Sequence, residues 1–135
     1  MTITLCGSLK FMDEIEGIDK KLKALGHRTF LPIKTPGIDY WDKNYHLMIE
    51  PPKRFGLFGK HMKMIEQSDA ILVANFPKGE IENYIGANTF IEMAFARYLG
   101  KKVFLLNPLP NQYYIADELE SMEPVVLDGN LKKIK

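Results

Sequence analysis

The sequence predicts an α/β fold: a single doubly wound domain with a five-stranded parallel sheet in the order 2-1-3-4-5. Three observations lead to this prediction. Short apolar runs alternate with longer segments of helical periodicity, which is the pattern of parallel βαβ units. The run Ala70–Ala74 is continuously apolar, as expected of a strand that is covered on both faces. Gly26 and Gly100 each end a helical segment just before the next apolar run.

The expected elements place the whole chain, residues 1–135, in one flavodoxin/Rossmann-like domain. A first helix is indicated by apolar residues at spacings of four, three, four and three, with Ser8 or Asp13 as its cap. These residues are Phe11, Ile15, Ile18, Leu22 and Leu25. Similar patterns predict helices over about 53–67, 88–99 and 114–122. The strands are expected at Thr2–Cys6, His27–Leu31, Ala70–Asn75, Val103–Leu106 and Val125–Leu127.

Residues 32–52 break the alternation of strands and helices. The segment is rich in proline and carries Tyr40, Trp41, Tyr45 and His46. Long loops in compact domains often serve as lids or binding loops. The aromatic rings of this segment either stack on a flat ligand such as a nucleobase or pack the segment against the body of the domain. Both interpretations stay open at this point.

Composition and charge exclude several classes of protein. The net charge of +1 gives no general electrostatic attraction to nucleic acid or to a membrane surface. The chain has one cysteine, so that neither a disulfide framework nor a cysteine metal cluster is expected. No apolar run approaches the roughly 20 residues of a membrane span. Because the start of the chain lacks the basic region and cleavage site of a secretory signal, we expect a cytoplasmic protein.

Glu92 is the candidate centre of the chemistry. It falls in the first turn expected for the helix at 88–99, and ligands in such folds bind where strand carboxyl ends meet helix amino ends. A carboxylate there stays ionised in the field of the helix dipole and can attack or stabilise a cationic, sugar-like transition state. The alternative is structural, because Thr89 and Glu92 have the spacing of a capping box.

Other polar residues near the strand ends are candidates for the same site. Asp69, at the start of the third strand, is either a second acidic group or a turn residue. The turns Gly7-Ser8 and Gly86-Ala87-Asn88 can present backbone amides to a phosphate or a sugar hydroxyl, and Lys10 would add a charge. His27, His46 and His61 show no metal-ligand spacing, so no metal is expected.

Two segments resemble one known family. Cys6-Gly7-Ser8-Leu9-Lys10 is similar to the Cys-Gly-Ser-Ile-Arg turn of the 2'-deoxynucleoside 5'-monophosphate N-hydrolases. Ser68–Val73, followed by Phe90–Ala96, resembles the Asp-bearing strand and the Gly-x-Glu-x-Gly-x-Ala helix start of the nucleoside 2-deoxyribosyltransferases. On these motifs the chain resembles the nucleoside 2-deoxyribosyltransferase family, to which both groups belong, over most of its length.

The resemblance implies an enzyme without metal or organic cofactor that acts on a small nucleoside or nucleotide, and not on nucleic acid or membranes. Glu92 would be the nucleophile that attacks C1' of a deoxyribosyl group, and Asp69 would orient or protonate the departing base. It also implies a homo-oligomer, a dimer or larger, whose subunits complete each other's sites, with 113–123 as the segment involved. The substrate-binding residues implied are Cys6, Gly7, Ser8, Lys10, Gly86 and Asn88.

The reaction type stays open among three alternatives. Gly86 stands where the transferases carry an acidic residue and the hydrolases a phosphate-binding serine, so both transfer and hydrolysis of a nucleoside 5'-monophosphate are possible outcomes. The first-strand tyrosine of many members has no clear counterpart at Thr4 or Leu5. A third alternative, of another class, is a non-catalytic nucleotide-binding sensor.

Overall fold

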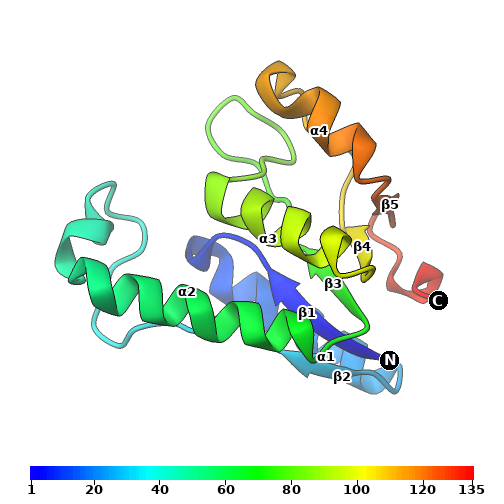
Figure 1. Cartoon of the computed structure of the whole chain (residues 1–135), viewed down its shortest axis with the longest axis horizontal. Helices are drawn as coiled ribbons and strands as arrows, with labels where there is room; N and C mark the ends of the chain where they lie inside the picture. Colours follow the sequence, from blue (N-terminus) through cyan, green and yellow to red (C-terminus); the bar gives the residue numbers. More distant parts are fainter.

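A five-stranded sheet, parallel throughout, forms the centre of the protein, and its strand order is β2-β1-β3-β4-β5. The computed structural model describes residues 1–135 (Figure 1). Fold class and strand order are therefore confirmed. The strands are β1 (Thr2–Cys6), β2 (Arg28–Phe30), β3 (Ala70–Val73), β4 (Lys102–Leu105) and β5 (Val125–Val126). The α-helices are α1 (Met12–Ala24), α2 (Pro51–Glu66), α3 (Ala87–Tyr98) and α4 (Ala116–Ser121).

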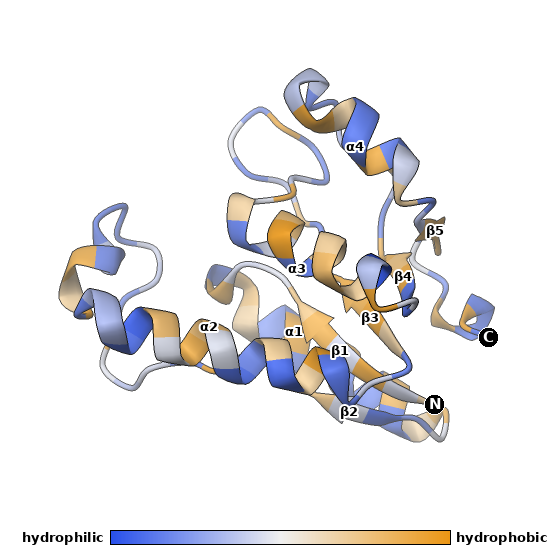
Figure 2. Ribbon diagram, viewed as in Figure 1, coloured by the Kyte–Doolittle hydropathy of each residue, from blue (hydrophilic) through white to orange (hydrophobic).

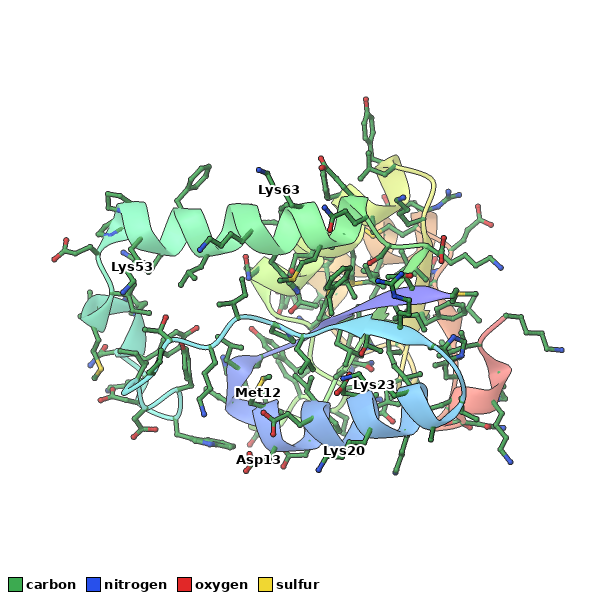
Figure 3. All side chains as sticks on the ribbon, turned by 90° about the horizontal axis from the view of Figure 1, so that it is seen from below. Met12, Asp13, Lys20, Lys23, Lys53 and Lys63 are labelled. Carbon is green, nitrogen blue, oxygen red and sulfur yellow. The ribbon has the colours of Figure 1, made fainter.

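Helices cover both faces of the sheet, because side chains alternate between the faces along each strand. On one face, Ile15 and Leu22 of α1 pack against Leu5 and Leu72 together with the C-terminal segment. The other face is covered by α2, α3 and α4, where Met93 is fully buried. Figure 3 shows α1 and α2 on opposite sides of the sheet. Figure 2 shows β1 and β3 as hydrophobic, whereas α2 alternates in hydropathy.

The register of the sheet aligns the carboxyl ends of its central strands. Cys6 is paired with Val73, and Val73 with Leu105, so β1, β3 and β4 end at one edge. Asn75 joins the chain beyond β3 to the chain beyond β4, since its side chain bonds Asn107 and Pro108. This edge is therefore held in place by the side-chain hydrogen bonds of Asn75 as well as by the hydrogen bonds between the strands.

The segments outside the sheet differ from the predicted boundaries in modest ways. Two short 3₁₀ turns, Leu9–Phe11 and Tyr113–Ile115, precede α1 and α4, and Ser8 caps the first of them. The loop at 32–52 contains a third, Tyr45–Met48. None of the helices has the length and apolar character needed to cross a membrane.

Candidate functional site

Glu92 lies in the second turn of α3, not in the first as predicted. The helix begins at Ala87, with Gly86 in extended conformation as its N-cap, and the amide of Phe90 donates to the Gly86 carbonyl at 2.9 Å. Thr89 therefore lies inside the helix, and α3 has no side-chain cap. The capping-box alternative is wrong for this structural reason. The Glu92 carboxylate therefore accepts no capping hydrogen bond from the backbone of its own helix.

Instead, the carboxylate meets two side chains from other elements. Glu92 is only 2% exposed, and its Oε2 is in direct contact with Nδ1 of His61 on α2. That oxygen has no other partner. On the other side of the ring, Nε2 lies 3.1 Å from the carbonyl oxygen of Leu5 at the end of β1. Because a carbonyl oxygen can only accept, Nε2 carries a hydrogen.

Cys6, the last residue of β1, is the second neighbour of Glu92. It is fully buried, and burial raises the pKa of its thiol well above the ordinary value. The negative charge of Glu92 raises the pKa further. The thiol therefore stays protonated, and its Sγ donates toward the Thr4 carbonyl oxygen, 4.0 Å away. Since Cys6 has no exposed surface, the structure does not place it against a substrate, and its contact is with Glu92.

A cavity of about 320 Å³, which we call the Glu92 cavity, opens beside the carboxylate. This volume falls within the range of small-molecule sites. Gly7 and Asn88 line it near the sheet edge, and His61 and Glu92 both belong to its wall. Its other lining residues are Leu9, Pro32, Ile33, Tyr40, Tyr45, His46, Ile49, Arg54, Leu57 and Phe58.

The 32–52 loop forms another wall of the Glu92 cavity. Tyr40 is buried, its hydroxyl accepts from the amide of Thr35 at 2.9 Å, and its ring centroid lies 5.1 Å from that of Tyr45. Trp41, by contrast, is 65% exposed and does not line the cavity. The packing interpretation therefore holds for Tyr40, while Tyr45 and His46 also face the cavity as a binding loop would.

A second cavity of about 370 Å³, the Ser8 cavity, adjoins the first at the start of α3. The two share Gly7, Leu9, Tyr45 and Asn88. Ser8, Gly86 and Lys78 line the second alone, and the Lys78 ammonium lies 4.9 Å from the centre of the Tyr84 ring. The largest cavity, about 740 Å³, lies between α1 and residues 129–132 and contains none of the predicted site residues.

The structure brings most of the predicted residues together and separates two of them. Glu92, Gly7, Ser8, Gly86 and Asn88 all line the adjoining cavities. Asp69 does not join them. It precedes β3 at the amino edge of the sheet, where it is exposed and accepts from the amide of Thr2 at 2.8 Å. Lys10 also lies outside both cavities, with its ammonium 5.8 Å from the Trp41 ring centre.

The correction for Asp69 follows from the direction of the strand. In a parallel sheet the residue before a strand lies at the edge opposite to the residue after it. Asp69 pairs with the start of β1, since its own amide donates to the Thr2 carbonyl at 2.8 Å. The motif match therefore selected a residue at the wrong end of β3, and the prediction that Asp69 shares a site with Glu92 is wrong.

His61 is the residue of the site that the sequence reasoning missed. It has no spacing to another histidine that suggests a metal, so the sequence alone gives it no role. One signal was present: His61 lies three residues after Phe58 and four before Ile65, so it belongs to the inward stripe of the predicted helix. A polar residue on an inward stripe needs a partner.

Comparison with solved structures shows the same fold in two enzymes. One is a 2-deoxyribosyltransferase from Bacillus psychrosaccharolyticus, with TM-score 0.56, 21% identity and coverage of 87% of this chain and 81% of that one. The other is the CMP N-glycosidase BcmB of Clostridium botulinum, with TM-score 0.53, 20% identity and coverage of 93% and 84%. The chain shares the fold of these two enzymes. The predicted resemblance to the nucleoside 2-deoxyribosyltransferase family is confirmed at this level.

Comparison of sequences adds no closer relative. No family model matches the chain, and no curated protein does. The function is therefore inferred from the residues of the site and the shared fold.

Proposed function

We propose that this protein is an enzyme that cleaves or transfers the N-glycosidic bond of a nucleoside or nucleotide, with Glu92 as the nucleophile. One observation carries the proposal. In a fold shared with a deoxyribosyltransferase and a CMP N-glycosidase, a buried carboxylate faces a cavity at the carboxyl edge of the sheet.

The reaction proceeds in two displacements. An oxygen of Glu92 forms a bond to C1' of the sugar while the bond from C1' to the base nitrogen breaks. The electron pair of that bond goes to the base, which takes up a proton from the solvent. In the second step water, or the N–H nitrogen of another base, attacks C1', gives up its proton to the solvent and releases the carboxylate. Water makes the enzyme a hydrolase, and a base makes it a transferase.

The surroundings of Glu92 suit this chemistry. The carboxylate lies among protein groups and not in bulk water. In this environment its charge stabilises a cationic sugar more strongly than it would in water. The Tyr45 ring in the cavity wall supplies a face on which a base can stack. The amino end of α3, with Gly86 and Asn88, supplies backbone amides toward sugar hydroxyls or a phosphate. These amides complete a site with a nucleophile at one end and polar donors at the other.

We further propose that the protein works as a homo-oligomer. Large side chains of α3 and of the 113–123 segment lie on the surface: Ile91 is 52% exposed, Tyr98 86% and Tyr113 87%. Exposed apolar side chains on neighbouring elements are typical of an interface. Light scattering during gel filtration tests this; a monomer at all concentrations would contradict it.

The test of the enzymatic proposal is an incubation with deoxynucleosides, ribonucleosides and their 5'-monophosphates, each with and without a second free base. An exchanged nucleoside identifies a transferase, and free base plus sugar or sugar phosphate identifies a hydrolase. Glu92→Gln keeps the size of the side chain and removes the nucleophile, so turnover is expected to fall by roughly 1,000-fold or more. Full activity in Glu92→Gln would refute the role of Glu92. Nucleotide binding without turnover in the wild type would favour the sensor alternative.

A further inference from the structure

We propose that His61 is a positioning residue for Glu92: the protonated imidazole ring holds Oε2 of the carboxylate and leaves the other oxygen to the cavity. The inference rests on the proposed function, because it assigns Glu92 as the attacking group. It concerns a residue on α2 that the motifs do not include. Its basis is the arrangement of three groups from β1, α2 and α3.

The hydrogen bond to Leu5 determines where the protons of the ring lie. Nε2 donates to the Leu5 carbonyl, so a neutral His61 would carry no hydrogen on Nδ1. The lone pair of Nδ1 would then face Oε2 of an ionised Glu92 in direct contact, with two acceptors and no donor between them. A buried contact of this kind is strongly unfavourable. One proton must therefore lie between Nδ1 and Oε2.

That proton belongs to the ring. A carboxylic acid is a stronger acid than an imidazolium ion, so the proton of a Glu–His pair resides on nitrogen. The pair is then a carboxylate held by an imidazolium, and each charge compensates the other in a buried place. Arg54 is the permanent cation in the cavity wall, but its Nε donates to the Ile49 carbonyl at 3.0 Å. His61 is therefore the cation in contact with Glu92.

A metal ion is the other cation that three such side chains suggest. The ligand atoms of Cys6, His61 and Glu92 lie within 4.8 Å of one another. Zinc, however, binds cysteine as the thiolate, whereas burial and the charge of Glu92 raise the pKa of the Cys6 thiol, so that it stays protonated. His61 and Glu92 contact each other directly, as the partners of a hydrogen bond do. The arrangement favours a proton.

This arrangement also accounts for the orientation of the nucleophile. Oε2 is completely buried against His61, whereas the Glu92 side chain keeps a 3% exposed remainder and lines the cavity. The exposed part therefore belongs to the rest of the side chain, including the second oxygen. Fixing one oxygen leaves a single rotamer from which the other can approach C1'.

The structural half of the test is nitrogen NMR of the histidine rings, which needs no turnover. In the wild type we expect both nitrogens of His61 to be protonated, with a strongly deshielded proton on Nδ1. Glu92→Gln should leave Nδ1 unprotonated, since the side-chain amide that this substitution introduces can donate to it. An unprotonated Nδ1 in the wild type overturns the proposal. So does zinc bound at one equivalent after addition of Zn²⁺ and lost in His61→Asn.

The kinetic half compares three variants. His61→Leu removes the donor, and kcat should fall by roughly 100-fold or more with little change in KM. His61→Asn restores an amide donor near the position of Nδ1 and should recover part of kcat. His27→Asn is the matched control, because the His27 ring is paired with the Met1 amino group, at 3.1 Å, beside the start of β1 and away from Glu92. Equal rates in His61→Leu and wild type overturn the positioning role. An inactive wild type instead refutes the proposed function, and the NMR measurement then tests by itself whether a protonated His61 holds Glu92.

Discussion

Replacement of Asn75 by alanine should destabilise the protein strongly, because this side chain fastens the ends of β3 and β4 to each other. Asn75 is fully buried. Its Nδ2 donates to the carbonyls of Asn107 and Pro108, each at 3.0 Å, and its Oδ1 accepts from the amide of Asn107 at 2.9 Å. Alanine removes all three hydrogen bonds and leaves two carbonyls and one amide without partners.

The magnitude follows from these bonds. A typical internal hydrogen bond contributes about 1 kcal/mol net, and a partner left buried without one costs somewhat more. Asn75→Ala should therefore lower the free energy of unfolding by about 3 kcal/mol. For a domain of this length each kcal/mol shifts Tm by about 3.5 °C, so Tm should fall by roughly 10 °C.

Asn107→Ala is the matched control for this prediction. It removes one side-chain hydrogen bond, from Asn107 Nδ2 to the Asn75 carbonyl at 3.1 Å, and keeps the backbone amide. We expect a loss of about 1 kcal/mol. Urea unfolding monitored by circular dichroism measures both variants. If Asn75→Ala were no less stable than Asn107→Ala, the assignment of this edge to the Asn75 side chain would be refuted.

Three further predictions concern residues near the site and on α1. Cys6, whose pKa is raised by burial and by Glu92, should resist thiol reagents at pH 7 in the folded protein and react completely in denaturant, which a labelling assay measures. Gly7→Ala should lose about 1–3 kcal/mol in urea unfolding, because a Cβ would lie 3.2 Å from a backbone oxygen just beyond β3. Burial raises the pKa of Asp19, but hydrogen bonds from Lys23 and Thr29 outweigh it and lower the pKa. The stability that this shift contributes is present above the unfolded-state pKa of about 3.9 and is lost as pH falls through the folded-state pKa. Asp19→Asn should therefore weaken the pH dependence of Tm below about pH 4.

The fold was predictable because each of its signals is local. Continuous apolar runs such as Ala70–Ala74 indicate strands covered on both faces, and glycines such as Gly100 separate helix from strand. Once strands and helices alternate, the rules for parallel connections leave few possible orders. The capping-box spacing puts the helix cap at Thr89, three residues later than the observed cap at Gly86, and this difference is what places Glu92 in the first turn instead of the second. Helix boundaries depend on backbone geometry at the cap, here Gly86, which composition does not determine.

The site was predictable only where a residue's place along its own strand or helix determines its position. Gly7 directly follows β1, and Asn88 lies in the first turn of α3, so the topology alone brings them to one edge. The motif match alone places Asp69 at the site, whereas the direction of β3 puts the residue that precedes it at the opposite edge, beside Thr2. His61 was missed because its role depends on contacts with Leu5 and Glu92, which are distant in sequence and meet only through packing.

The end of β1 explains why the carboxylate can be held from two sides at once. Successive residues of a strand send their side chains to opposite faces. The Leu5 side chain packs on the face of α1, while the Cys6 thiol points to the face of α2 and α3, where Glu92 lies. The Leu5 backbone carbonyl binds the ring of His61. A shift of β1 by one residue against β3 would exchange these roles, so the register that builds the sheet also sets the surroundings of the nucleophile.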